Sequence, residues 1–452
     1  MKKIIFSFIL GCLVLSSCRD YVEIDAIGQR TLKYTDDYQY LLNYDNFISQ
    51  AFYYTELASD EVDISDEGFQ TRMSTKDAAV YTWADYIYSD TEEDNDWTKL
   101  YKEIYICNQV IEGVMDSEKG TEKEKANIYA QAQVHRAFAY LDLVNVFAKQ
   151  YDKETASTDE GVPLLLTPDL YASLKRASVQ EVYDQIQKDL KEAMLILPDA
   201  QSNAYNASKI SAYGVMARTC LQMGEYDAAY AYADSVLQKK NTLLDLNDYI
   251  NNKTSFPKKM YNPEVVLYKT LSNLGPVLPL SNHLLGLLGE KDLRYQLFTV
   301  PGTNFSWNSF NGRGYSGYQL TYDGVYTGPC VPEMMLIKAE VLARNGNYTD
   351  AISLVNDLRK KRFAPADYTD LTATSKEEAL QTVIDERQRE FFGRGFRWYD
   401  QKRLNKEAAL AQTVTRTFKG ETYTLAPNDN HYVFPIANKY IILNPEITQN
   451  PR

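Results

Sequence analysis

The stretch 217–229 reads ARTCLQMGEYDAA, and the stretch 338–352 reads KAEVLARNGNYTDAI. Both have the same order: a helical segment with small side chains, a glycine, an aromatic residue, and alanine on the next helical segment. Glycine accepts the left-handed conformation that ends a helix, and alanine lets two helices approach closely. This order is typical of tetratricopeptide helix pairs. Because such a solenoid needs at least three units, we expect further helix pairs within 97–148 and 178–222.

Helix signals recur along the whole chain. Ser or Thr followed three residues later by Glu, which marks the start of a helix, occurs at Thr121, Ser178 and Ser375. The sequence therefore predicts a mostly α fold, a tetratricopeptide-like helical solenoid. Its helices are expected near residues 36–56, 97–116, 121–147, 178–197, 208–222, 225–239, 332–345, 348–361 and 375–392.

Two long stretches interrupt the helical rhythm, at about 58–96 and 241–331. The first is acidic and aromatic, and the second is rich in Pro, Gly, Asn and Tyr. Irregular segments of this length in a compact domain are usually functional or disordered, and a high aromatic content argues against disorder. We therefore interpret both as insertions that hold a binding site.

The composition is that of a folded protein with an acidic surface. Of 452 residues, 44% are hydrophobic and 24% are charged, and the formal net charge is −13. An acidic chain binds polyanions poorly, so nucleic acid is not an expected partner. The 36 Tyr, against 17 Phe and 4 Trp, indicate aromatic surfaces that are partly wet.

The N-terminus has the pattern of a secretory signal peptide. Lys2 and Lys3 precede an apolar run, Ile4–Leu15, which is too short to span a bilayer and ends in Leu-Ser-Ser-Cys18. This ending resembles a bacterial lipobox, in which the Cys becomes the first residue and carries acyl chains such as palmitate. We expect residues 1–17 to be a lipoprotein signal peptide and Cys18 to be the lipidation site. The alternative is an ordinary signal peptide with a chance Cys.

Motifs spread over nearly the whole mature chain, 18–452, resemble the SusD/RagB family. The motifs are RAFAYLDLV at 136–144, GVPL at 161–164, IDERQREFFGRGFRWYD at 384–400, and Pro435-Ile436, Asn444-Pro445 and Gln449-Asn450-Pro451 near the end. The chain ends at Arg452 without the Gly-Tyr that closes the family pattern.

The resemblance implies a lipid-anchored, cell-surface, outer-membrane protein of the Bacteroidetes type. Such proteins partner a TonB-dependent SusC-like transporter and deliver oligomeric nutrients to it. The resemblance implies an oligosaccharide ligand or, as the alternative, an oligopeptide; it implies no catalytic activity and no cofactor. It places the ligand in the two insertions, where the shared motifs are absent.

Glycan recognition needs flat aromatic rings that stack on sugar faces, and polar groups that bond hydroxyl edges. The insertions supply both kinds of residue, although each could instead be loop core. The candidate ligand-binding residues are Tyr81, Trp83, Tyr86, Trp307, Asn308, Arg313, Tyr315 and Tyr318.

An acidic run in the first insertion provides the alternatives to a simple binder. A surface hydrolase would need two carboxylates flanking a cleft, and oxygen-rich loops also suit a structural calcium ion, although no EF-hand spacing is present. We interpret the run as a solvated loop and predict no catalytic or metal-ligating residue. The acidic residues are Asp60, Glu61, Asp63, Asp66 and Glu67.

The charged residues of the last long motif have two readings, an acid/base or anion site and a structural clamp. Carboxylates paired with Arg are held charged, which suits an ion-pair network better than general-acid chemistry. We therefore predict that these residues, together with stacking of Trp398, clamp the C-terminal segment to the solenoid. The residues are Glu386, Arg387, Glu390, Arg394, Arg397 and Asp400.

Overall fold

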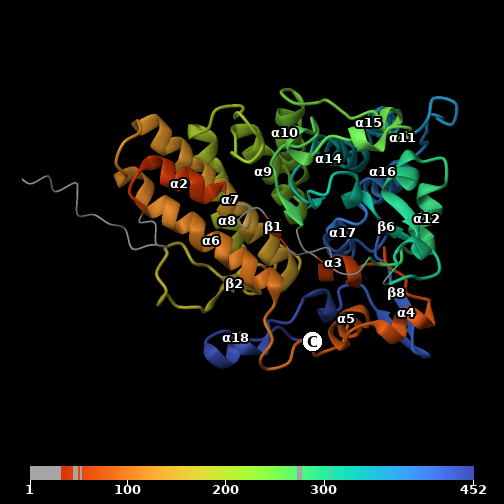
Figure 1. Cartoon of the computed structure of the whole chain (residues 1–452), viewed down its shortest axis with the longest axis horizontal. Helices are drawn as coiled ribbons and strands as arrows, with labels where there is room; N and C mark the ends of the chain where they lie inside the picture. The colour runs from red at the N-terminus through yellow and green to blue at the C-terminus, as the bar shows by residue number, and fades with distance from the viewer. Residues whose placement is uncertain (1–31, 44–48, 51–52, 272–276, 307) are drawn as a thin grey trace, which may run out of the picture.

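The computed structural model describes residues 32–43, 49–50, 53–271, 277–306 and 308–452. Within these residues the chain is mostly helical, and neighbouring long helices follow one another across the molecule (Figure 1). The predicted fold class is therefore confirmed. The predicted signal peptide, with its cysteine, lies outside the described residues. Among the described helices, none combines the length and apolar character needed to cross a membrane.

The long helices match the ranges predicted from the sequence, apart from the first. The capping boxes at Thr121 and Ser178 are formed. At the third start, Glu378 instead accepts the backbone N–H of Thr374 at 2.7 Å. The solenoid helices are α6 (Asn95–Gly113), α7 (Glu122–Phe147), α8 (Val179–Ile196), α9 (Lys209–Met223), α10 (Tyr226–Leu237), α14 (Val331–Arg344), α15 (Tyr348–Arg359) and α16 (Lys376–Phe391).

The turns of the two repeats have the geometry that their glycines predict. Gly224 follows α9 with φ 73°, and Gly346 follows α14 with φ 81°. Both values lie in the left-handed region, which a residue with a Cβ enters only at a cost. Ala229 and Ala351, on the helices that follow, are fully buried. Small side chains thus let α10 and α15 pack closely on their preceding helices.

The single helix predicted over 36–56 is wrong. The structure has α2 (Thr35–Leu42) and α3 (Tyr53–Ala58), and strand β1 (Ser49–Gln50) lies between them. This strand pairs in parallel with β4 (Thr270–Leu271) of the second insertion. The backbone there is used in a sheet ladder, which a local helical pattern cannot reveal.

The insertions contain only short elements, as their weak periodicity predicts. A three-stranded sheet has the order β1-β4-β7, and β5 pairs with β6. The elements are α4 (Glu67–Arg72) and α5 (Thr75–Tyr81) in the first insertion, and α11 (Asn247–Ile250), α12 (Asn282–Leu288), α13 (Leu293–Phe298), β5 (Thr299–Pro301), β6 (Arg313–Tyr315) and β7 (Val325–Tyr326) in the second. Between α7 and α8, β2 (Glu160–Pro163) pairs with β3 (Arg176–Ser178).

The C-terminal part adds a β-hairpin that we had not predicted. Its turn residues are Lys419, at φ 51°, and Gly420, at φ 84°, and two positive φ values are what a tight two-residue hairpin loop requires. The elements of this part are α17 (Phe396–Leu404), β8 (Val414–Phe418), β9 (Glu421–Leu425) and α18 (Asn438–Leu443).

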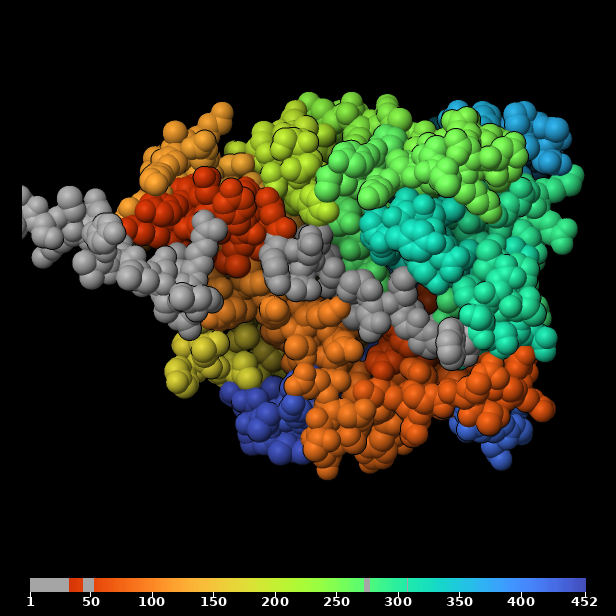
Figure 2. Space-filling view, viewed as in Figure 1, coloured from red at the N-terminus to blue at the C-terminus, as the bar shows by residue number. Residues whose placement is uncertain are grey.

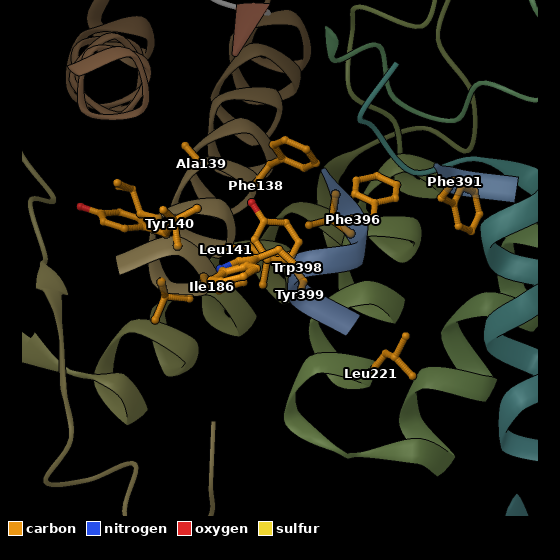
Figure 3. Packing of buried hydrophobic residues seen from close by; sticks show 14 of the residues in the cluster. Phe138, Ala139, Tyr140, Leu141, Ile186, Leu221, Phe391, Phe396, Trp398 and Tyr399 are labelled. Carbon is orange, nitrogen blue, oxygen red and sulfur yellow. The ribbon is translucent and has the colours of Figure 1, made fainter. Parts of the chain in front are cut away.

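The C-terminal segment shares one core with the solenoid. Figure 3 shows side chains of α7, among them Phe138 and Leu141, beside Trp398 and Tyr399 of α17. The indole of Trp398 is fully buried, with its ring centre 4.8 Å from that of Tyr432. Trp398 therefore packs on the C-terminal segment as predicted, but its rings meet those of Tyr432 and Phe434 tilted and edge-on and do not stack.

The predicted ion-pair clamp is also confirmed, and it reaches further than expected. Arg387 pairs with Asp400 at 2.7 Å, which joins α16 to α17. Glu386 pairs at 2.8 Å with Arg294 of the second insertion, which also bonds Glu390. Burial alone would raise the pKa of Glu386, but three neighbouring guanidinium groups lower it to about 2. The motif therefore fixes the insertions as well as the C-terminus.

Candidate functional site: a polar groove

A groove of about 1110 Å³ opens where both insertions meet the hairpin. In Figure 1 the three segments that surround it lie on the right of the molecule, with α12 above β8 and α4, and Figure 2 shows the same side in space-filling form. Its lining is dominated by hydroxyl, amide and charged groups. The lining residues are Asp60, Val62, Asp63, Ser65, Glu67, Gln70, Thr71, Ser281, Asn282, His283, Gln412, Thr413, Val414, Thr415, Arg416, Thr417, Lys419 and Gly420.

Backbone hydrogen bonds hold the two insertions together at this groove. The N–H of Asp63 donates to the carbonyl of Pro279 at 3.1 Å. The carboxylate of Asp66 caps α4 and accepts the backbone N–H of Asn311 at 3.0 Å. These two backbone donors lower the pKa of Asp66. The two insertions are therefore in direct contact beside the groove.

The amide side chain of Gln70, in the first insertion, hydrogen-bonds to the β8–β9 hairpin. Gln70 donates to the carbonyl of Thr417 at 3.3 Å and accepts the N–H of Lys419 at 2.8 Å. The ring of Phe418 lies 5.8 Å from that of Tyr81. Because inward residues pack in this way, the alternating side chains of β8, such as Thr417, are exposed toward the groove.

Arg416 forms a buried part of the groove wall. Its guanidinium donates to the carbonyls of Leu57 at 3.2 Å, Ala58 at 3.1 Å and Tyr81 at 2.7 Å. Its central carbon lies 4.2 Å from the Tyr81 ring centre and 4.4 Å from that of Trp83. Burial lowers the pKa of Arg416 to about 10, and no carboxylate of the described chain forms an ion pair with it. Carbonyls and ring faces therefore stabilise this charge.

The expectation that Tyr81 and Trp83 offer open ring faces to a ligand is wrong. Their exposed fractions are 0% and 6%. Trp83 donates its indole N–H to the carbonyl of Ala58 at 3.0 Å, and the Tyr81 hydroxyl accepts the N–H of Ile64 at 2.9 Å. The guanidinium of Arg416 occupies a face of each ring. Both aromatics thus support the groove wall from behind.

The next three candidate residues do not line the groove or lie outside the residues that the structure describes. Tyr86 is 81% exposed and lines a separate hollow with Pro435 and Asn438. Trp307 lies outside the described residues. Asn308 is half-buried in the loop that follows β5. Contact of these residues with ligand stays a prediction.

The last three candidates hold the second insertion in shape. Arg313 donates to the hydroxyl of Thr299 at 2.8 Å, which ties β6 to β5. The ring of Tyr315 packs edge-on against Phe392 with ring centres 5.5 Å apart. Tyr318 is half-buried and shares a small cavity with Tyr315. None of these three lines the groove, and their role toward ligand stays a prediction.

The interpretation of the acidic run as a solvated loop is wrong for Glu61, which is buried, and for Asp60, which is paired. Asp60 accepts two hydrogen bonds of 2.7 Å from Arg397. Burial would raise the pKa of Asp60, but the Arg397 charge holds it below its ordinary value. Asp63 and Glu67 also line the groove. Among the described residues, no three His, Cys, Asp or Glu side chains gather as a metal site would require. A structural calcium ion in the acidic run stays a hypothesis.

Two segments of the groove were missed by sequence reasoning, 281–283 and 412–420. The second had a readable signal. Val414, Arg416 and Phe418 alternate with threonines, which is the period of a strand with one buried face, and Lys-Gly follows as a turn. The first begins α12, where Ser281 accepts the N–H of Leu284; only its fold context brings it to the groove.

The fold and the groove define a class: a helical-repeat protein whose insertions and C-terminal hairpin line a groove, held by a buried ion-pair clamp. Comparison with known families agrees. Residues 21–221 match the family described as "Starch-binding associating with outer membrane", and residues 331–452 match the SusD family. The chain belongs to the SusD/RagB family.

Relatives of known name or structure point the same way. The chain is 24% identical to SusD-like protein P38 of Formosa agariphila, over 78% of each chain. A SusD superfamily crystal structure from Bacteroides thetaiotaomicron has a TM-score of 0.73 at 20% identity, covering 93% of this chain and all of that one. A laminarin-binding SusD-like protein has a TM-score of 0.67 at 19% identity, covering 93% of this chain and 99% of that one. These structures share the fold.

Proposed function

We propose that this protein binds an oligosaccharide in the polar groove at the cell surface. The observation behind the proposal is the groove itself, whose rim offers hydroxyls, an amide and an imidazole. Thr415, Thr417, Asn282 and His283 are all exposed there. Such groups bond sugar hydroxyls, and a cleft of this size holds several sugar rings. The laminarin-binding structural neighbour supports a glycan over a peptide.

The charge of the groove favours a neutral glycan. Lys419 is balanced by Asp63 and Glu67 on the facing wall, and Arg416 is turned toward carbonyls. A groove of mixed sign repels neither hydroxyls nor glycosidic oxygens, whereas an anionic polymer would need a positive surface. We therefore expect neutral glucans, with laminarin oligosaccharides as the first probe.

The second part of the proposed function is delivery of the bound glycan to a transporter. An acylated Cys18 would anchor the protein to the outer membrane, and a TonB-dependent SusC-like transporter would take the bound glycan. The family description, which places its members at the outer membrane, supports this step. Copurification of such a transporter from solubilised outer membranes, lost when the anchor is removed, is the expected result.

Titration calorimetry against laminarin oligosaccharides, other neutral glycans and peptides, with mass spectrometry of the products, tests the function. Binding of a glycan without turnover is expected. Cleaved glycan would make the protein a surface hydrolase that uses its acidic run. Binding of peptides alone would transfer the proposal to the oligopeptide alternative, and no binding at all would contradict both.

A further inference from the structure

Two buried glutamates, here called the glutamate pair, lie next to the groove wall in the chain. Glu56 on α3 and Glu61 just after it are 8% and 1% exposed, and both carboxyl groups contact the same turn, Gly393–Gly395. Glu61 accepts the N–H of Gly393 at 3.2 Å, and Glu56 accepts that of Gly395 at 3.0 Å. A deprotonated carboxylate only accepts hydrogen bonds. Two negative charges buried at one turn repel each other, so we expect the pair to retain a proton.

The charged and titratable groups around the pair leave that proton in place. Asp60 adds negative charge from the same segment. Arg397 faces the pair from α17, but its guanidinium is committed to Asp60. Tyr53 of α3 and Tyr315 of β6 line a small cavity together with Glu56, and the positive charge of Arg394 acts on Tyr315. Within the described chain, no Lys or Arg forms an ion pair with either glutamate.

Electrostatics agrees with the geometry. Burial raises the pKa of Glu56 to about 7, against the opposing effect of the Gly395 and Gly393 N–H groups. Burial, together with the charges of Glu56 and Asp60, raises the pKa of Glu61 well above its ordinary value. Two carboxyl groups in contact titrate as one unit. The pair thus holds protons at weakly acidic pH and begins to lose them as the pH rises past about 7.

The pair is linked directly to the groove. Glu61 lies between Asp60 and Val62, which both line the groove. Its backbone carbonyl accepts the N–H of Ser281, another lining residue, at 2.7 Å. The carboxyl groups hold the same segment to the loop between α16 and α17. Loss of the proton would place two buried negative charges in contact, which moving this segment would relieve.

We propose that the glutamate pair is a proton-dependent lock on the groove: the proton that the pair retains keeps Asp60–Asp63 in place, and loss of this proton loosens that part of the groove wall. The effect on ligand rests on the proposed function, and the loosening of the segment does not. A glycan should therefore bind more tightly at weakly acidic pH than at alkaline pH. One linked proton changes an equilibrium by at most about tenfold per pH unit.

Hydrogen exchange of the mature chain, corrected for intrinsic rates, measures the lock without any ligand. Protection of 57–63 in the natural chain should fall about fivefold or more between pH 6 and pH 8.5. Glu61→Gln supplies a permanent donor to Glu56 and should remove this dependence, and Glu56→Gln is the second variant if the first folds poorly. Glu377→Gln, an exposed carboxyl on α16, should behave as the natural chain.

Protection that does not change with pH in the natural chain would overturn the lock. An equal change in both Gln variants would also overturn it. Laminarin affinity in the same samples separates the two proposals. If protection depends on pH but laminarin does not bind, the lock is supported and the glucan proposal is not. If laminarin binds the natural chain equally well at every pH, the groove proposal is supported and the effect of the lock on ligand is not.

Discussion

Arg416→Ala should destabilise the protein and deform the groove wall. The substitution leaves the carbonyls of Leu57 and Tyr81 without this donor, whereas the carbonyl of Ala58 keeps the indole N–H of Trp83. Each orphaned buried carbonyl costs about 1–3 kcal/mol. It also removes contacts with the rings of Tyr81 and Trp83, each worth up to about 2 kcal/mol when desolvated. Relief of the cost of burying an unpaired charge offsets part of this loss.

We expect a net loss of about 3 kcal/mol in the free energy of unfolding, measured by urea denaturation with an unchanged slope. Arg416→Lys keeps the charge but not the fork of donors, so its loss should be intermediate. Thr424→Ala, on the exposed side of β9, is the control and should cost little. A loss below about 1 kcal/mol for Arg416→Ala would refute the reasoning, because the carbonyls would then be satisfied without the guanidinium.

Three further predictions concern the clamp, a buried lysine and the anchor. Trp398→Ala should lower the free energy of unfolding by about 3–5 kcal/mol in urea, since its indole is fully buried; a loss under about 1 kcal/mol would contradict the clamp. Burial lowers the pKa of Lys402 to about 7, so the unfolded chain binds more protons between pH 7 and pH 10 and stability should rise across this range; thermal melts should show this rise in the natural chain and not in Lys402→Met. Cys18→Ala should abolish incorporation of labelled fatty acid while the melting temperature stays unchanged; label in this variant would exclude Cys18 as the lipidation site.

The solenoid could be predicted from the sequence because its signals are local. Capping boxes, turn glycines and packing alanines each act within a few residues, and the structure has the helices they predict. The failure over 36–56 has a non-local cause. Ser49–Gln50 pairs with Thr270–Leu271, more than two hundred residues away along the chain, and no periodicity reports such a pairing.

The groove was predicted less well, for a physical reason. Composition gives residue types that suit a glycan, but it does not say which ring faces are open. Tyr81 and Trp83 have suitable rings, and a buried arginine from the C-terminal hairpin covers them. Conversely, the threonines of β8 carry a local strand signal, since they alternate with buried residues, but that signal does not say that the strand faces a groove. The clamp was predicted correctly, since opposite charges spaced along one helix find partners under almost any packing.

Glycan affinity after filling the groove tests the central claim most directly. Thr415→Trp places an indole in the groove from an exposed strand position, and Lys188→Trp, on the exposed side of α8, is the matched control. Calorimetry with the tightest-binding glycan of the panel should show at least about tenfold weaker binding for Thr415→Trp, equivalent to about 1.4 kcal/mol. The melting temperature should be unchanged, and the control should bind as the natural chain does. Equal affinity for Thr415→Trp and the natural chain would contradict the account and place the ligand outside the groove.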